Sequence, residues 1–371
     1  MMSDIKKGLI GVISDETKVS EVMPEINSLT YRGYAVQDLC ENCKFEEVAY
    51  LILNNDLPNK KQLKDFENQE KINRSISNNL KNIIRNYPKN AHPMDTTRTS
   101  VSYMGLEDPE VNNNSPEANY RKSIRLMAKM STIVAASFRV KRGENIIDPN
   151  NDLGFCENFF HMCFGKIPSK EVVKAFDASM TLYAEHSFNA STFTSRVISS
   201  SLSDLHGAIT GAIASLKGPL HGGANEAVAH MIKEVGSADK AKDFILSKIK
   251  KKQLIMGFGH RVYRNGDSRV PTMTKYYHKT AKYYQNTELP KISKVLEDTM
   301  LKEKNIKPNL DFPAGPTYYL MGFDIDFFTP IFIVSRITGW CAHVMEQFEN
   351  NKLIRPLSKY IGEPLRKVSN N

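Results

Sequence analysis

The chain has 371 residues, 41% of them hydrophobic, which is enough for one large core or for two lobes that share a cleft. Its formal charge of +9 comes from lysines spread along the chain without an interleaved aromatic platform, so nucleic acid is not an expected partner. The most apolar stretch, residues 318–340, is interrupted by Asp324, Asp326 and Arg336, so no membrane span is expected.

The amino-terminal residues 1–18 have no apolar signal-peptide core and no arginine, which favours a cytoplasmic protein. The five cysteines are odd in number and scattered, as is typical of reduced thiols. Cys40 and Cys43 form a CxxC pair without a second pair to complete a tetrahedral site. We interpret them as a pair on a helix surface and expect no metal.

Helical periodicity dominates the chain. Apolar residues three or four apart predict helices around residues 45–52, 124–138 and 228–235. Ser115-Pro116 is a helix start, and Lys141, Arg142 and Gly143 form a helix end. Strand patterns are scarce, apart from a short pairing predicted around Ile10 to Val19. The fold should be all-α.

His221 lies in a glycine-rich segment, residues 218–226, that leads into one of these helices. The positive end of the helix dipole disfavours an imidazolium, so a neutral ring could donate a hydrogen bond to an enolate or oxyanion. The alternative is that His221 only caps the helix.

His260 lies in a second glycine-punctuated segment, residues 257–269, which also contains Arg261, Arg264 and Arg269. One histidine among three arginines suits polarisation of a carbonyl and binding of carboxylates or phosphates. An exposed basic loop would have the same composition.

Asp311 lies between Leu310 and Phe312, where desolvation would raise the pKa of its carboxyl towards that of a general base. It could instead cap the helix that follows. Arg336 borders the apolar face of a helix predicted to open at Thr329-Pro330, and such a charge requires an anionic partner, either a protein carboxylate or a substrate.

Other chemistries lack their motifs. His186, His221 and His260 are 35 and 39 residues apart, unlike the short spacing of helical metal sites. The sequence contains no P-loop, GxGxxG fingerprint or GxSxG elbow, which argues against nucleotide hydrolysis, hydride transfer and serine hydrolysis.

From about Lys7 to Gly362 the chain resembles the citrate synthase family. The likeness is carried by SLTYRGYAVQDL (28–39), HPMDTTRTSVSYMG (92–105), YAEHSFNASTFTSRV (183–197), GPLHGGANEAV (218–228), MGFGHRVYRNGDSR (256–269), PNLDFPAGPTYYLMG (308–322), FTPIFIVSRITGWCAHVMEQ and IRPLSKYIG. HPMD and the YAEHSFNASTF block are most similar to the branch called 2-methylcitrate synthase or citrate synthase II, with propionyl-CoA as an expected substrate and acetyl-CoA as the alternative.

The resemblance implies a role for each matching residue. Asp311 removes the α-proton of the acyl-CoA, His221 donates a hydrogen bond to the thioester oxygen, and His260 polarises the oxaloacetate ketone. The oxaloacetate carboxylates are held by His186, Arg269, Arg336 and, from the other subunit, Arg355; the CoA contacts are Arg264 and the backbone from Leu254 to Gly259, including Gly257. No permanently bound cofactor is implied, since the CoA thioester is a co-substrate.

The resemblance also implies an all-α homodimer with shared active sites. Residues 1–221 and 323–371 would form a large domain, and residues 222–322 an inserted small domain that closes over oxaloacetate. A lyase that cleaves a citryl-CoA would keep the same residues, and a non-catalytic scaffold is the remaining alternative. The sequence alone does not rank propionyl-CoA over acetyl-CoA, because one methylene in an apolar pocket changes binding by only about 1–3 kcal/mol.

Overall fold

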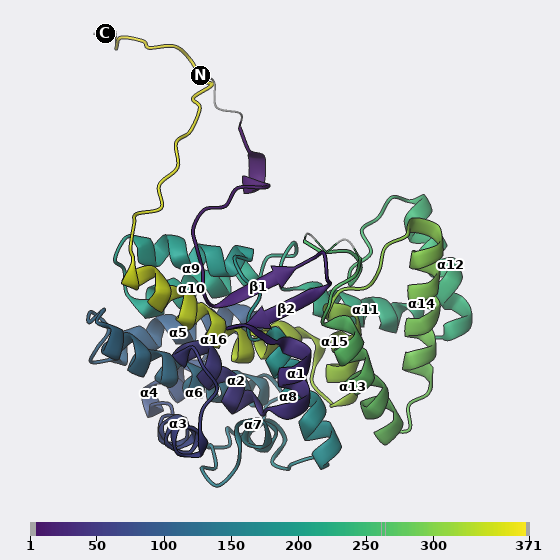
Figure 1. Cartoon of the computed structure of the whole chain (residues 1–371). Coiled ribbons are helices and arrows are strands. Elements are labelled where there is room, and N and C mark those ends of the chain that lie inside the picture. Colours follow the sequence, from purple (N-terminus) through teal and green to yellow (C-terminus); the bar gives the residue numbers. More distant parts are fainter. Residues whose placement is uncertain (1–4, 261, 264, 369–371) are drawn as a thin grey trace.

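The computed structural model describes residues 5–260, 262–263 and 265–368, and these fold mainly into α-helices, as predicted (Figure 1). The first helices are α1 (Val36–Asn42), α2 (Phe45–Asn54), α3 (Lys60–Ile72), α4 (Asn78–Arg85), α5 (Pro93–Glu107), α6 (Pro116–Lys141), α7 (Phe155–Phe164) and α8 (Lys170–Tyr183). They are followed by α9 (Ala190–Ser200), α10 (Leu205–Leu216), α11 (Ala224–Val235), α12 (Ala238–Lys250), α13 (Val270–Tyr283), α14 (Glu288–Lys304), α15 (Asp311–Leu320) and α16 (Phe328–Glu349). Short 3₁₀ helices cover Lys7–Leu9 and Ile325–Phe327.

The bounds of α6 follow from its end residues. Ser115 caps the helix by accepting a hydrogen bond from the Ala118 amide, and Pro116 takes the first helical position. The helix ends at Lys141, and Gly143 adopts a φ of 75°, which an L side chain rarely tolerates. Both ends of this helix were predicted from the sequence.

The one sheet in the described residues is a small antiparallel one, and it does not lie where the sequence analysis placed it. It consists of β1 (Ser20–Met23), β2 (Ser28–Tyr31) and β3 (Tyr34–Ala35), with Ser20 opposite Tyr31. The predicted pairing around Ile10 to Val19 was wrong, because Ile10 and Ile13 are exposed, whereas Leu29 and Tyr31 on β2 are fully buried. Burial of one strand face determines where the sheet forms.

Two hydrophobic clusters make up the interior. The larger one is built around α16, which packs against α2, α6, α8 and α9. The smaller one joins α11, α12 and α14 through residues such as Val228, Ile245 and Leu296 (green helices in Figure 1). All members of the smaller cluster lie within 222–322, but Met273 and Tyr318 from the same range pack into the larger one. Helices α13 and α15 therefore connect the two clusters.

Helix α16 is the central element of the larger cluster. By length and composition, Ile325–Glu349 is the single segment among the described residues that could cross a membrane, yet 89% of its most apolar window is buried inside the protein. It is the core helix of a folded domain. Cys40 is also fully buried, so the interpretation of Cys40 and Cys43 as a surface pair was wrong for Cys40.

Both chain ends extend away from the helical body (Figure 1). Residues 5–16 and 355–368 are exposed along their whole length. Several of their apolar side chains are largely uncovered, including Ile13, Leu357, Tyr360, Ile361 and Leu365. Apolar surface of this kind is typical of segments that another chain covers.

Candidate active site

His221 lies in the turn between α10 and α11, three residues before α11 begins. Its Nε2 accepts a hydrogen bond from the Ser191 amide at 3.2 Å and lies 2.8 Å from the Ser191 hydroxyl. Because an amide only donates, Nε2 is unprotonated, and the proton of the neutral ring is on Nδ1. Burial, with a smaller contribution from Arg336, lowers the pKa of His221 to about 4. The neutral ring therefore results mainly from burial rather than from the helix dipole.

Ser191 is held in turn by two further groups. The Trp340 indole N–H donates to the Ser191 hydroxyl at 3.1 Å, and that hydroxyl lies 2.8 Å from the Asn189 side-chain oxygen. Trp340 is fully buried. Ser191, Asn189 and Trp340 were not named as site residues from the sequence, although Ser191 and Asn189 lie in the YAEHSFNASTF block.

His260 has the opposite tautomer. Its Nδ1 accepts hydrogen bonds from the amides of Val262 and Tyr263, at 3.1 and 3.3 Å, so the proton of the neutral ring is on Nε2. Burial and the nearby Arg269 guanidinium lower the pKa of His260 to about 4. The His260 ring lies 5.1 Å from the His186 ring, centroid to centroid. Both His221 and His260 are thus neutral hydrogen-bond donors at neutral pH.

Asp311 is the first residue of α15 and lies at the junction of the two clusters. Its Oδ1 accepts a hydrogen bond from the Tyr183 hydroxyl at 2.7 Å. Burial raises the pKa of the Asp311 carboxyl to about 6, even though the Tyr183 hydrogen bond and the charges of Arg269 and Arg336 lower it. Such a carboxyl is ionised at pH 7 and is still basic enough to take a proton. The alternative role of Asp311 as a helix cap does not account for this hydrogen bond.

Arg336 and His186 present polar groups that the protein itself leaves without a full set of partners. Arg336 is buried, donates from Nε to the Tyr183 carbonyl at 2.6 Å, and lies over the Phe332 ring. It makes no ion pair with any described residue. The protein carboxylate that acts on it most strongly is the buried Glu185, which is itself hydrogen-bonded to His343. His186 is buried, and its Nε2 has no hydrogen-bond partner among the described residues. A buried cation and a buried ring nitrogen of this kind favour an anionic ligand.

Arg269 is paired with Asp267, a residue that the sequence analysis missed. Two hydrogen bonds, of 2.9 and 2.7 Å, join the Arg269 guanidinium to the Asp267 carboxylate. Asp267 also accepts from the Leu310 amide at 3.1 Å, which ties Arg269 to the segment carrying Asp311. The Arg269 charge keeps the pKa of Asp267 well below its usual range despite burial.

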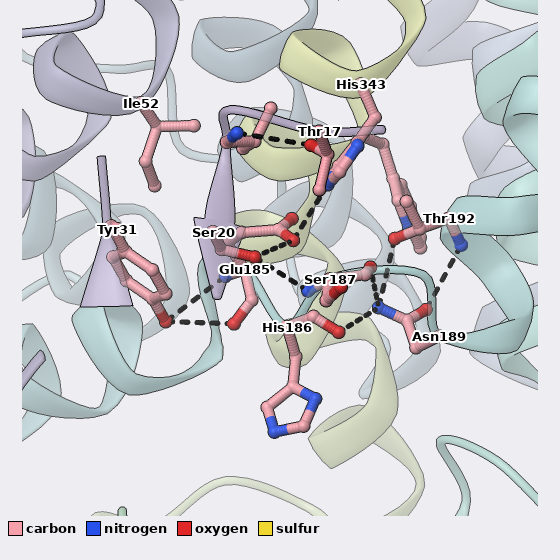
Figure 2. Close-up of polar contacts among 12 residues, drawn as sticks. Thr17, Ser20, Tyr31, Ile52, Glu185, His186, Ser187, Asn189, Thr192 and His343 are labelled. Atoms are coloured by element: carbon pink, nitrogen blue, oxygen red, sulfur yellow. Dashed lines mark hydrogen bonds and ion pairs between the residues drawn. The ribbon is translucent and has the colours of Figure 1, made fainter. Parts of the chain in front are cut away.

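The segment that carries His186 is supported from both sides (Figure 2). Tyr31 on β2 donates to the Glu185 carbonyl at 3.0 Å, and Ser20 on β1 accepts from the Ser187 amide at 2.9 Å. His343 on α16 bonds to the Glu185 carboxylate at 2.8 Å. Figure 2 shows the His186 ring pointing away from these contacts. The small sheet and α16 therefore fix the backbone and leave the ring available.

Close approach of α16 to this segment requires a glycine. A Cβ atom on Gly339 would collide with the Ala184 carbonyl and the Glu185 carboxylate. Any larger residue at position 339 would push the His186 segment away from α16.

The described residues predicted to contact CoA lie on a loop in which Leu254 is exposed and Gly257 is buried. Leu254 is 72% exposed, and Gly257 and Gly259 have φ values of 85° and 80°, which favour glycine. The Gly257 carbonyl accepts from the Asn309 amide, and the Gly259 carbonyl from the Asn309 side chain, both at 2.9 Å. The loop is thereby attached to the segment before Asp311.

Two predicted contacts remain. Arg264 lies outside the described residues. Arg355 is exposed on the extended carboxyl-terminal segment. Within the described part of the chain, no group of three or more His, Cys, Asp or Glu side chains could hold a metal ion.

Comparisons with known proteins agree over nearly the whole chain. The family model described as "Citrate synthase, C-terminal domain" matches residues 8–357. The chain is 52% identical to a citrate synthase of Mycolicibacterium smegmatis, covering 98% of this chain and 97% of that protein. It is 51% identical to a 2-methylcitrate synthase of Mycobacterium tuberculosis, covering 98% and 92%. A ternary complex of carboxymethyl coenzyme A and oxaloacetate with citrate synthase from Thermoplasma acidophilum aligns with a TM-score of 0.94 at 30% identity, covering 99% and 98%.

Proposed function

The chain belongs to the citrate synthase family and condenses an acyl-CoA with oxaloacetate, and we propose that His221, His260 and Asp311 are its catalytic residues. The observation that carries this assignment is the protonation pattern: one carboxyl with a raised pKa and two neutral histidines with opposite tautomers. An enolisation requires a base and a hydrogen-bond donor, and attack on a ketone requires a second donor.

The first step forms the enolate of the thioester, which a hydrogen bond stabilises. The Asp311 carboxylate removes a proton from the α-carbon of the acyl-CoA, while His221 donates its Nδ1 proton in a hydrogen bond to the thioester oxygen. A neutral donor suits this step, since an imidazolium would be held only below a pH of about 4. Stabilising the oxygen where charge develops lowers the barrier without charging the ring.

The second step forms the carbon–carbon bond. The enolate carbon attacks the ketone carbon of oxaloacetate. His260 polarises that ketone through Nε2–H and passes this proton to the new alkoxide; its ring regains a proton from water, and Asp311 releases the proton that it took, so that both groups return to their starting state. Water then cleaves the citryl-type thioester, which releases free CoA and the tricarboxylate. No permanently bound cofactor takes part, because the CoA thioester activates its own α-carbon.

Oxaloacetate binds to His186, Arg269 and Arg336 in this proposal. Two observations on the described residues support it: the Nε2 of His186 has no hydrogen-bond partner, and Arg336 has no ion pair. Arg269 has its Nε and one terminal nitrogen engaged by Asp267, and its remaining terminal nitrogen has no hydrogen bond to a described residue. The two carboxylates of oxaloacetate would give these groups charge-assisted hydrogen bonds.

A homodimer would complete the site through Arg355 of the partner subunit. The exposed residues 5–16 and 355–368 support an assembly in which these segments lie on a second copy. We also propose that residues 222–322 move as a small domain against residues 1–221 and 323–371, and that Leu254, Gly257, Gly259 and Arg264 contact CoA. The smaller cluster, which lies wholly within 222–322, supports this division.

Propionyl-CoA is the acyl donor that we propose as the natural substrate, with acetyl-CoA as the second candidate. Relatives named citrate synthase and 2-methylcitrate synthase are equally similar to the chain, so both substrates are supported. The ratio of kcat/KM for the two thioesters decides between them. We further propose the cytoplasm as the compartment, which the five free cysteines support.

The test of the catalytic assignment is Asp311→Asn, which keeps the size of the side chain but removes the base. We expect kcat to fall by about 10²–10⁴-fold, while calorimetry still detects oxaloacetate binding. Asp298→Asn, on the exposed face of α14, is the matched control and should retain full activity. An Asp311→Asn enzyme with more than about a tenth of the original kcat would exclude Asp311 as the base.

A further inference from the structure

Tyr183 is the last residue of α8, and its side chain is almost fully buried beside the catalytic carboxyl. Its hydroxyl donates to Asp311 Oδ1 at 2.7 Å. Its ring packs on Phe332, with the two centroids 4.2 Å apart. Packing on the Phe332 ring therefore holds the Tyr183 side chain in one orientation.

The main chain of the same residue reaches the oxaloacetate side. Arg336 Nε donates to the Tyr183 carbonyl at 2.6 Å, and the Arg336 guanidinium lies 4.6 Å from the centre of the Phe332 ring. Tyr183 therefore contacts Asp311 from α15 with its hydroxyl and Arg336 from α16 with its carbonyl. One residue sets the distance between the base and a substrate-binding cation.

We propose that Tyr183 is a positioning residue that holds Asp311 through Oδ1, so that Oδ2 is the oxygen that receives the α-proton. This inference rests on the proposed role of Asp311. A carboxylate on a single rotatable bond presents either oxygen, and a fixed donor on one of them leaves the other for the substrate.

Tyr183 remains a donor across the working pH range, because burial and the neighbouring Asp311 carboxylate raise the pKa of its phenol well above the usual value. The other charged groups that act on Asp311 are Arg269 and Arg336, which lower the pKa of its carboxyl, and Asp267, which raises it. Removing the Tyr183 hydroxyl takes away a group that favours the carboxylate, so the pKa of Asp311 should rise.

Tyr183→Phe tests the inference in the full-length enzyme. We expect the acid limb of the pH profile of kcat to move to higher pH by about one unit. A hydrogen bond to a charged group contributes about the free energy that shifts a pKa by one unit. The KM for oxaloacetate should change little, because the carbonyl that binds Arg336 remains. A purely structural role would alter thermal stability without moving the acid limb.

Tyr318→Phe is the matched control. Tyr318 is also fully buried and donates to Ser179 on α8 at 3.1 Å, so that its hydroxyl does not hold an Asp311 oxygen. We expect its pH profile to stay in place. An equal shift in both variants, or an unmoved limb in Tyr183→Phe, overturns the inference.

A second change covers the case in which Tyr183→Phe does not fold. Fluorinated tyrosine at position 183 keeps the ring and strengthens the donor, so the acid limb should move to lower pH; no movement, or movement upward, overturns the inference. Asp311→Asn separates this outcome from failure of the proposed function. If Asp311→Asn stays active, the assignment of Asp311 as the base is wrong. If Asp311→Asn is inactive and the changes at position 183 do not move the acid limb, only the role of Tyr183 is wrong.

Discussion

The proposed oxaloacetate side and the proposed acyl-CoA side of the site are built differently. On the first, His186, Arg269 and Arg336 are buried. The strands, α8 and α16 hold Arg336 and the segment of His186, and Asp267 holds Arg269. On the second, Leu254 is exposed, whereas Ile255 packs into the smaller cluster and the loop 254–259 is hydrogen-bonded to Lys307 and Asn309. We call the first the preformed side and the second the open side, and we propose that a ligand or a movement of the smaller cluster completes the open side.

This difference suggests an order of events. Arg336 has no ion pair, and the Nε2 of His186 has no hydrogen-bond partner, among the described residues. Buried polar groups of this kind are costly until a ligand satisfies them. Oxaloacetate would satisfy them and allow the smaller cluster to close, which would then shape the acyl-CoA side.

The largest effect on oxaloacetate binding is expected from Arg336→Gln, which removes a cation from the preformed side. Loss of a buried charge contact should lower kcat/KM for oxaloacetate by about 100-fold or more, and calorimetry should show weaker oxaloacetate binding. Arg142→Gln is a matched control, because Arg142 also lies over a phenylalanine ring, Phe138, but on the surface. Unchanged oxaloacetate affinity in Arg336→Gln would remove Arg336 from the binding site.

The sequence identified the residues of the preformed side better than their supports. His186, His221, His260 and Asp311 lie in long motifs, three of which contain glycine or proline. Contacts join these segments: His186 with His260, His221 with Ser191, and Asp267 with Leu310. Asp267 was missed even though it lies two residues before Arg269, since nothing in the local pattern shows that a carboxylate pairs with its neighbour. The predicted strand pairing failed for the related reason that burial depends on distant segments.

Tyr183, Ser191 and Trp340 were missed for another reason. The Tyr183 and Asp311 contact spans 128 residues, and the Trp340 and Ser191 contact spans 149. Helical periodicity marks Trp340 as a core residue but says nothing about where its N–H points. Local patterns predict which face is buried, whereas hydrogen bonds between distant helices require the assembled fold.

An intermediate effect is expected for the order of binding. Oxaloacetate should tighten the binding of coenzyme A by about 5–150-fold, the usual range of coupling between two sites. Calorimetric titrations with and without oxaloacetate measure this factor. Equal affinity for coenzyme A in both titrations would show that the open side does not depend on the preformed side. In the Arg336→Gln enzyme, oxaloacetate should no longer change the affinity for coenzyme A.

The smallest effect is expected in an experiment on Arg355, in which only part of the activity returns. Arg355 is exposed on the carboxyl-terminal segment of its own chain. If Arg355 of the partner subunit completes the oxaloacetate side, a two-fold dimer makes the donation reciprocal. Asp311→Ala and Arg355→Leu are each expected to be inactive alone. After the two are unfolded and refolded together, one site of a mixed dimer carries both defects, and the other combines an intact Asp311 with an intact Arg355.

That second site should work. With random assortment about half of the dimers are mixed and one of their two sites is intact, so activity should return to about a quarter of the unchanged enzyme. Mass measurement confirms that mixed dimers are present, and each parent refolded alone is the control. If Arg355 served its own chain, every site in every dimer would keep one defect, and the mixture would show no more activity than the sum of its parents. The exposed position of Arg355 on residues 355–368 favours recovery, because the segment leaves the body of its own chain.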